Sequence, residues 1–336
     1  MDAVNPSLSP GLALAGASQN RLPNDKAGGA SAVFDEDWWL EAAAPGAWDR
    51  ARVVWDGELV GEMAFHVRRR WGLTYLRMPH LTRTMSPRLY APPGKAVTRD
   101  INNVAIVAEL LKKLPPHDRF ERALNPGCSS VPGFVHAHLA ATHMFTFRSA
   151  PGDGPEAMLK LAHGEARRAI NKAQRDCEVE RSMDLDRFIK LHHQSYGDET
   201  LVDYVILRRL FEAAAAKGQA EIVFVRLNGA ADTAAMIVVW DRQAAYTWLL
   251  ARDAKQNYVG ATSLLTFEAM RTAHRLGCML DLDGYVNPKV GAFLMKFGLP
   301  AVARPYINSS SALWKGLRAA TTLLNPLRPD RHFRVP

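Results

Sequence analysis

Two stretches that lie far apart in the chain repeat one order of strands and turns. Residues 51–79 contain a strand, a turn at Asp56-Gly57, a second strand, a polar turn and a third strand. Residues 220–250 follow the same order, with Asn228-Gly229 at the first turn. An Asp-Gly or Asn-Gly pair between apolar runs is a strong hairpin signal. We therefore expect two antiparallel β-meanders, related by a weak internal duplication.

Helical patterns flank both meanders. Apolar residues of 102–114 recur on one helical face before a Pro-Pro pair. Residues 155–177 predict one long helix, 184–197 a helix capped by Asp184, and 204–218 a helix that ends at a glycine. The predicted fold class is α/β with mixed sheets, in two lobes that each hold a mostly antiparallel sheet flanked by helices.

The Pro- and Gly-rich segment 151–155 divides the chain. We expect a first lobe over 33–150 and a second over 151–318, with tails at 1–32 and 319–336. The first tail reads as disordered rather than as a signal peptide, because no basic region precedes its short apolar piece. No run of 18 apolar residues occurs, so we expect no transmembrane helix.

Charge and cysteine content restrict the partners. The 336 residues hold 42 Lys and Arg against 34 Asp and Glu, a net charge of +8. This excess favours anionic partners, such as phosphate-bearing cofactors, nucleotides, RNA or an anionic membrane surface, but a merely basic soluble protein has the same composition. The 3 cysteines are widely spaced, so we expect neither a disulfide framework nor a zinc ribbon, and a reducing cytoplasm fits.

One segment of the second lobe has the features of a phosphate site. A strand ends near Leu250, and a polar loop leads into a helix that begins at Gly260, Ala261 and Thr262. Small residues let backbone N–H groups approach a ligand, and the positive end of the helix dipole suits a pyrophosphate. The next strand ends at Asp283.

This order of strand, small-residue loop, helix and strand resembles an N-acetyltransferase of the GNAT type. The loop of that superfamily carries Arg/Gln-x-x-Gly-x-Gly/Ala, and the sequence at 257–262 is NYVGAT, which keeps only the central glycine. Three further stretches resemble the FemAB-like branch, which includes a CelD-like set associated with cellulose production. They are ARRAINKAQRDCEVE at 166–180, DLDRFIKLHHQSYG at 184–197 and LDLDGYVNPKVGAFLMKFG at 280–298.

The resemblance implies two GNAT-like lobes that face each other across a cleft, and transfer of an acyl group to an amine. Members of that branch use acyl-CoA or aminoacyl-tRNA, so we expect acetyl-CoA or another acyl-CoA as donor, with aminoacyl-tRNA as the alternative. The acceptor is then a small or nucleotide-linked amine, in envelope or exopolysaccharide metabolism. A non-catalytic binding protein derived from a GNAT core is a third reading, because most of the loop motif is lost. The reading includes no DNA partner and no metal, and peripheral membrane association is compatible with it.

Several residues are candidates for the site. Asp283 and Tyr285 could orient or deprotonate the amine and protonate a leaving thiolate, and the resemblance adds Lys296 as a third catalytic candidate. Arg168 and Lys172 share a helix face and could bind phosphates of the substrate, with Asp281 nearby. The donor would contact Leu249, Leu250, Ala251, Arg252, Asn257, Gly260, Ala261 and Thr262.

Each candidate has a plainer alternative. Asp283 could cap the helix that starts at Pro288 or form an Asx-turn, and the basic helix face could simply be solvated. His136 and His138 would share one strand face, but they lack further ligands at metal-binding spacing.

Overall fold

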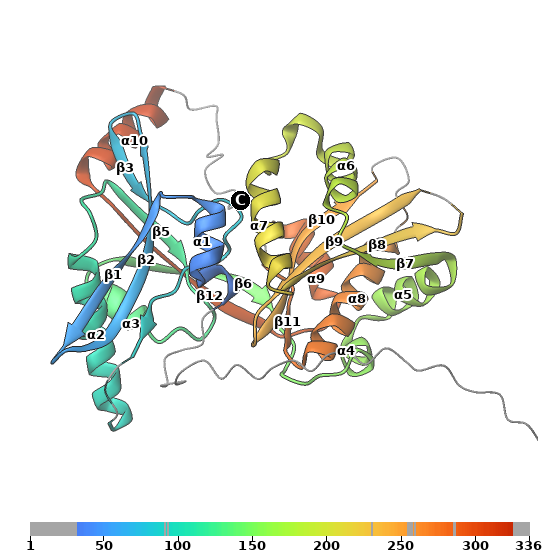
Figure 1. The fold of residues 1–336 in the computed structure, drawn as a ribbon, viewed down its shortest axis with the longest axis horizontal. Coiled ribbons are helices and arrows are strands. Elements are labelled where there is room, and N and C mark those ends of the chain that lie inside the picture. Colours follow the sequence, from blue (N-terminus) through green and yellow to red (C-terminus); the bar gives the residue numbers. More distant parts are fainter. Residues whose placement is uncertain are drawn as a thin grey trace, which may run out of the picture.

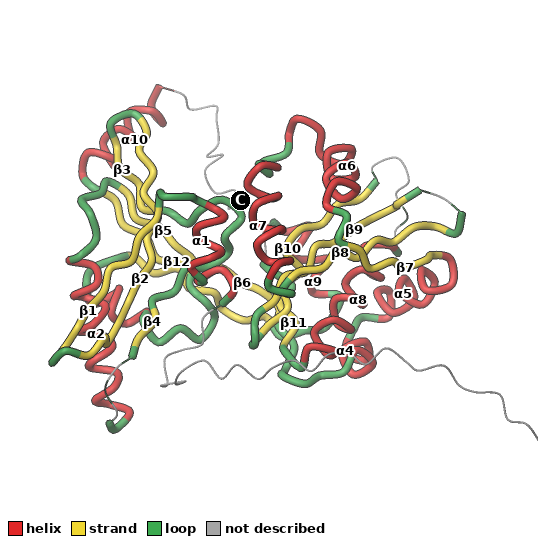
Figure 2. The backbone as a smooth tube through the Cα atoms, in the orientation of Figure 1, coloured by secondary structure: helices red, strands yellow, loops and turns green. Residues whose placement is uncertain are grey.

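The computed structural model describes residues 32–90, 92, 94–229, 231–253, 258, 260–284 and 287–324. Its strands form two sheets that lie side by side, the first at the left of Figure 1 and the second at the right. Helices flank both sheets, and Figure 2 shows α1 and loops of the chain between them. The mixed α/β fold class with two lobes is confirmed.

The first sheet has 7 strands in the order β1-β2-β3-β5-β12-β6, with β4 paired to β2. Their bounds are β1 Trp48–Trp55, β2 Glu58–Arg70, β3 Leu73–Leu76, β4 Arg88–Leu89, β5 Arg119–Ala123, β6 Ala140–Phe147 and β12 Ala301–Ser310. Strand β12 comes from the segment expected in the second lobe, yet it pairs with β5 and β6 (red in Figure 1). The two lobes are therefore interlaced through the last strand.

The helices that come before β5 and directly after it pack on two different cores. They are η1 Val33–Asp35, α1 Asp37–Ala43, α2 Ala96–Lys112 and α3 Val131–His136, while α10 Ala312–Leu324 follows β12. The core between α2, α3 and the sheet contains Met63, Ile106 and Phe134. Instead, Phe34 and Trp39 of the N-terminal helices pack with the core of the second sheet.

The second sheet has 5 strands in the order β11-β10-β9-β8-β7. They are β7 Cys177–Ser182, β8 Ala220–Leu227, β9 Asp232–Trp240, β10 Ala244–Arg252 and β11 Met279–Asp281. Helices α6 Leu185–Tyr196 and α7 Tyr204–Ala216 cover one face. The short helix η2 Gly197–Glu199 lies between them in the chain. Helices α4 Pro155–Leu161, α5 Gly164–Asp176 and α8 Ala261–Leu276 lie on the other face, and α9 Pro288–Met295 follows β11. Consecutive residues of β8 point to opposite faces, so Phe224 packs in one core and Val225 in the other, as expected of a strand covered on both faces.

The turn and cap predictions are confirmed at several points. Asp56 and Gly57 both have positive φ, 48° and 83°, which the first hairpin requires. Asp184 caps α6 by accepting from the Arg187 N–H at 2.9 Å. Gly218 follows α7 with φ of 64°.

Two local predictions are wrong. The long helix over 155–177 is divided, because Ala162 is extended and the His163 N–H donates to the carbonyl of Lys296 at 2.7 Å instead of continuing α4. His136 ends α3 and His138 has φ of 64° in the following turn, so these residues do not share a strand face. A third difference concerns α10, which runs to Leu324 and into the expected tail.

Candidate functional site

Strand β11 pairs in parallel with the beginning of β10 and ends at Asp281, whereas β10 continues beyond it. Their parallel register covers only Ala244–Tyr246 against Met279–Asp281 in the described residues. Beyond this point β10 continues along β9 to Arg252, with a register shift between Thr247 and Leu249. A bulge there re-aims the backbone of β10. Beyond Tyr246 this edge of β10 has no strand partner among the described residues, and we call this unpaired edge the opening.

Arg83 of the first lobe reaches this opening. Its Nε donates to Oδ2 of Asp283 at 2.6 Å, and its Nη2 donates to the carbonyl oxygen of Trp248 at 2.8 Å. The Trp248 ring donates in turn to the carbonyl oxygen of Leu81 at 3.0 Å. The bulge residue of β10 is thus held by a loop of the other lobe.

A buried ionic cluster lies directly beside Arg83. Asp281 is fully buried and accepts from Nε of Arg148 at 2.6 Å and from the Thr146 hydroxyl. Arg304 lies 3.6 Å from Asp281 and 3.4 Å from Asp283. We call Arg83, Arg148, Asp281, Asp283 and Arg304 the interlobe cluster, because its arginines come from the first lobe and from β12.

The pKa values of the two carboxyl groups in the cluster are shifted in opposite directions. Burial raises the pKa of Asp283, and Arg83 and Arg304 offset only part of this effect. At Asp281 burial also acts upward, but Arg304 and Arg148 together lower the pKa below its ordinary value. Asp281 therefore acts as a fixed anion, whereas Asp283 lies closer to gaining a proton.

The side chain of Asp283 does not cap α9, which was the alternative role for this residue. Asn287 caps α9 by accepting from the Val290 N–H at 2.9 Å, while Asp281 accepts from the Asp283 N–H at 2.8 Å. Asp283 itself has φ of 53°, a left-handed conformation that few residues adopt. Its carboxylate faces the two arginines.

The predicted donor strand 249–252 is partly enclosed. Leu249 and Ala251 are buried, and the N–H of Arg252 donates to Oγ of Ser195 at 3.0 Å. Since the Asp253 N–H donates to β9, alternation turns the N–H of Leu250 to the same side as that of Arg252. Leu250 is thus the residue of this strand whose amide is aimed into the opening.

The start of α8 is tightly packed against α5. A Cβ on Gly260 would lie 2.9 Å from the carbonyl oxygen of Ala169 and 3.0 Å from Cβ of Ala173. Glycine is therefore required there by helix packing, whatever else it does. Ala261 is buried and Thr262 is half-buried in the first turn.

Basic side chains accompany this helix start. The Lys172 ammonium lies 5.8 Å from the centre of the Tyr258 ring, and Arg168 is exposed on the same face of α5. The predicted residues Asn257 and Tyr285 lie outside the described residues.

Lys296 does not join the interlobe cluster. Its Nζ lies 2.7 Å from Oε1 of Glu165, at the start of α5. Gly298, just after it, would place a Cβ 2.2 Å from the carbonyl oxygen of Leu161. The contacts of this closing motif dock the end of α9 onto the junction of α4 and α5.

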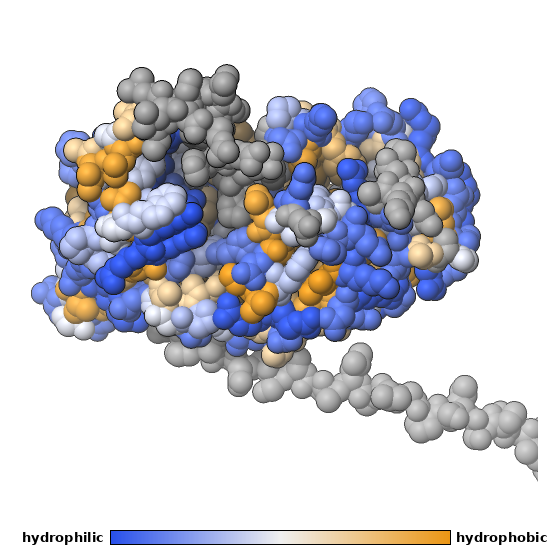
Figure 3. Space-filling view, turned by 90° about the horizontal axis from the view of Figure 1, so that it is seen from above, coloured by the Kyte–Doolittle hydropathy of each residue, from blue (hydrophilic) through white to orange (hydrophobic). Residues whose placement is uncertain are grey.

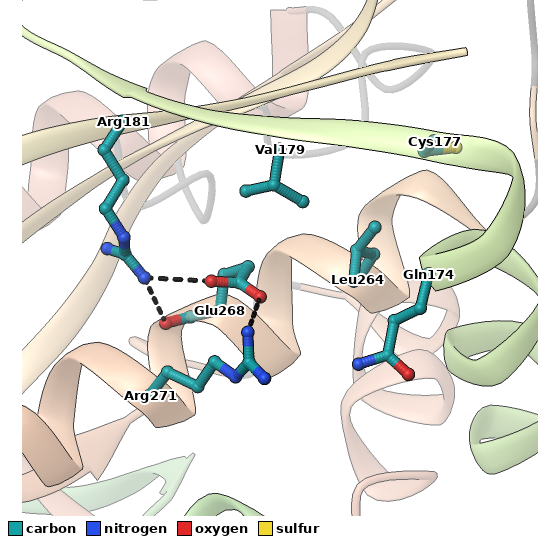
Figure 4. Close-up of a pocket in the computed structure, with 7 residues that line it drawn as sticks. All are labelled: Gln174, Cys177, Val179, Arg181, Leu264, Glu268 and Arg271. Atoms are coloured by element: carbon teal, nitrogen blue, oxygen red, sulfur yellow. Dashed lines mark hydrogen bonds and ion pairs between the residues drawn. The ribbon is translucent and has the colours of Figure 1, made fainter. Parts of the chain in front are cut away.

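Two surface hollows lie away from the strand opening. One of about 510 Å³ is lined by β7, α5 and α8, and there Glu268 pairs with Arg181 at 2.9 Å and with Arg271 at 3.1 Å (Figure 4). The other, about 730 Å³, is lined by Trp48, Phe65 and neighbouring residues of β1 and β2, and by Lys113 and Pro115 after α2. Among the described residues, no group of three or more His, Cys, Asp or Glu could hold a metal ion.

Known proteins share parts of this architecture. Residues 162–285, which run from before α5 to just after β11, match a family described as an acetyltransferase (GNAT) domain. The second sheet and its helices therefore resemble a GNAT domain in sequence. No curated protein matches the sequence significantly.

Solved structures match over both lobes. The crystal structure of FemX has a TM-score of 0.65 at 13% identity, over 87% of this chain and 96% of that one. A C-terminal domain (DUF2156) assigned to a lysylphosphatidylglycerol synthetase from Agrobacterium fabrum has a TM-score of 0.52 at 14% identity, over 87% and 93%. L-PGS from Bacillus licheniformis has a TM-score of 0.50 at 9% identity, over 84% and 90%. At such identities the likeness shows the fold alone.

Sequence reasoning missed the arginines of the cluster. Arg83 lies in an irregular segment between Leu76 and β4, and Arg148 and Arg304 lie at or beside strands of the first sheet. None of these positions has a motif around it. The one available signal was their partner, because a buried strand that ends in two aspartates requires cations nearby.

Proposed function

We propose that the protein is an N-acyltransferase that holds an acyl donor along the opening between β10 and β11 and transfers the acyl group to an amine. The observation that carries this proposal is that β11 ends at Asp281 while β10 continues beyond Tyr246 without a strand partner on that edge, inside the segment that matches a GNAT domain. An open strand edge offers backbone amides to a donor that lies along it, in the way that another strand would pair with it.

The chemistry needs a neutral amine, a stabilised oxyanion and a donor held in line. The Leu250 amide is aimed at the opening, and the Arg83 guanidinium lies at its edge, beside Trp248. Both are donors suited to a developing negative charge on the acyl carbonyl. Leu250 and Arg83 therefore form the proposed oxyanion-stabilising pair.

Proton transfer is assigned to Asp283. Burial raises its pKa, which brings the carboxylate nearer to the proton affinity that a general base needs. It accepts the proton that the attacking amine loses, while the donor's sulfur or oxygen leaves with the bonding electron pair. Tyr285 remains the proposed source of a proton for that leaving group.

Acyl-CoA is the proposed donor. The first turn of α8 contains no acidic residue, and Arg168 and Lys172 are exposed on the neighbouring face of α5. This combination suits the phosphates of a nucleotide-linked donor. The proposed acceptor is a primary amine of envelope or exopolysaccharide metabolism.

Aminoacyl-tRNA is the second candidate donor. The tight packing of Gly260 against Ala169 leaves less room at the start of α8 than its glycine suggests, and the loop motif is degenerate. The net charge of +8 also favours a large polyanion.

A product assay separates the donors. Purified protein is incubated with a pool of primary amines and either acetyl-CoA or aminoacyl-tRNA, and acylated amines are detected by mass spectrometry. Products from acetyl-CoA alone support the first donor, and products from aminoacyl-tRNA alone support the second. No product from either donor would overturn the proposed activity in favour of a binding protein.

A further inference from the structure

The hairpin between β2 and β3 ends in an exposed basic and aromatic tip. Arg68, Arg69 and Arg70 are all exposed, and no carboxylate of the described residues pairs with them. Trp71 follows with 81% of its surface exposed, and the Arg70 guanidinium lies 4.1 Å from the centre of its ring. A single exposed tryptophan is not unusual, but one that lies next to further exposed apolar side chains points to an interaction surface.

Helix α10 exposes an apolar stripe of its own. Leu313 and Leu317 are one turn apart and are 59% and 48% exposed. Trp314 turns the other way, with the Arg119 guanidinium 4.7 Å from its ring. The helix is therefore held to the sheet by Trp314 while its leucines face outward, beside an exposed Lys315.

The hairpin tip and α10 lie at the same end of the first sheet. Asp118 accepts from the Thr74 N–H at 2.9 Å and from the Ser311 hydroxyl at 3.0 Å. The Ser311 N–H also donates to the backbone carbonyl of Asp118 at 2.7 Å. One residue thus ties the start of β3 to the start of α10, and both elements lie at the upper left of Figure 1. Figure 3 views the molecule from this side, and hydrophobic residues come to the surface at its left among hydrophilic ones.

The hairpin tip and α10 contain no acidic residue, although Asp118 lies between them. No aspartate or glutamate occurs between residues 63 and 99 or between 284 and 329. A surface that combines such charge with exposed leucine and tryptophan matches the interface of an anionic bilayer, where basic side chains meet the headgroups and apolar ones enter the acyl boundary.

We propose that the hairpin–α10 surface, made of Arg68, Arg69, Arg70, Trp71, Leu313, Lys315 and Leu317, docks the protein on an anionic membrane. None of the described helices has the length and hydrophobicity required to cross a bilayer. The proposed contact is peripheral. RNA would use the arginines and could stack on Trp71, but it gives no role to the two leucines. The leucines therefore favour the membrane, and they make the two partners separable by experiment.

The test is sedimentation of the full chain with vesicles of phosphatidylcholine, with and without one third phosphatidylglycerol. We expect binding to the anionic vesicles only, weakened by salt. The triple variant Arg68→Gln/Arg69→Gln/Arg70→Gln and the double variant Leu313→Ser/Leu317→Ser should each lower partitioning at least about tenfold. The matched control is Leu201→Ser/Val205→Ser, because these residues of the second lobe are 59% and 70% exposed, and it should bind as the wild type does.

Thermal melts accompany each variant, so that loss of folding is not read as loss of docking. Absence of binding to anionic vesicles would overturn the proposal. Vesicle binding that is unchanged in the leucine variant would also overturn it. If, in addition, only the arginine variant loses binding to bulk tRNA, the surface binds nucleic acid instead. A leucine variant that melts much lower than the control would show instead that the chain itself covers these side chains, which also contradicts docking.

Discussion

At the scale of single residues, Asp283 has the most constrained position in the site. Its backbone adopts a left-handed conformation with φ of 53°. Its carboxylate contacts Arg83, 200 positions earlier, and Arg304, 21 positions later. A buried ion pair of this kind contributes little net stability while intact, but loss of one partner leaves a charge buried and uncompensated. The contacts of Asp283 with Arg83 and Arg304 therefore hold the proposed base in place and also join the two lobes.

Substitution of Asp283 by asparagine separates these two roles. We expect the free energy of unfolding to fall by about 3 kcal/mol, because Arg83 and Arg304 lose a carboxylate. If Asp283 is the base, kcat for acyl transfer falls as well, while the affinity for the donor is retained. The measurements are chemical denaturation and steady-state kinetics.

Asp186→Asn is the matched control, because Asp186 pairs with Arg208 on the exposed side of α6. Exposed pairs contribute at most about 1 kcal/mol, so this variant should keep both stability and activity. A stable Asp283→Asn protein with unchanged kcat would remove Asp283 from the mechanism.

The lowered pKa of His192 makes the stability of the folded protein depend on pH. Burial, with a smaller effect from His193, lowers its pKa from 6.5 to about 4 in the folded protein. An unfolded chain takes up this proton near pH 6.5 and the folded one only near pH 4, so stability is fully present above 6.5 and falls as the pH drops through that window. Melting temperatures of wild type and His192→Phe across pH 4–7 should show a flatter profile for the variant. His193→Gln, at an exposed position, should keep most of the wild-type slope, because burial is the larger cause of the lowered pKa of His192. An unchanged slope in His192→Phe would exclude His192 as the cause.

At the scale of elements, local chemistry predicted much of the fold. The hairpin at Asp56-Gly57 and the cap at Asp184 depend on neighbouring residues, which is why the sequence alone identified them. The division between α4 and α5 depends on Lys296, which lies far along the chain, so periodicity could not reveal it. The prediction of one long helix failed because a distant backbone group competed for its hydrogen bonds.

Glycines at two element junctions give a test of packing. Gly260→Ala would press a methyl group against the Ala169 carbonyl, and Gly298→Ala would press one against Leu161 in a backbone with φ of 70°. We expect each to lower the free energy of unfolding by about 1–3 kcal/mol, with Gly298→Ala the more severe because strain adds to overlap. Denaturant titration measures both.

Gly164→Ala is the control, because its new methyl group would meet only the movable end of Arg168. Alanine suits a helix better than glycine, so this variant should equal or exceed the wild type in stability. Wild-type stability of Gly260→Ala would contradict the packing account and return Gly260 to a purely ligand-binding role.

At the scale of the whole molecule, the two sheets meet along one seam. The end of β6 pairs with β11 through Arg148 and Asp281, and β12 returns from the second lobe into the first sheet. The sequence predicted the two lobes and the acidic end of β11, but the arginines of the seam come from segments without any motif. Arg83 and Asp283 are 200 positions apart, and only the assembled fold brings them together.

The central claim is that the opening beside this seam binds an acyl donor. The measurement that tests it most directly is a thermal melt of the purified protein with and without millimolar acetyl-CoA and CoA. A ligand at about 100 times its Kd stabilises the folded state by about 2.7 kcal/mol, so we predict a clear rise in Tm with both compounds. An unchanged Tm with both would contradict acyl-CoA binding at this site.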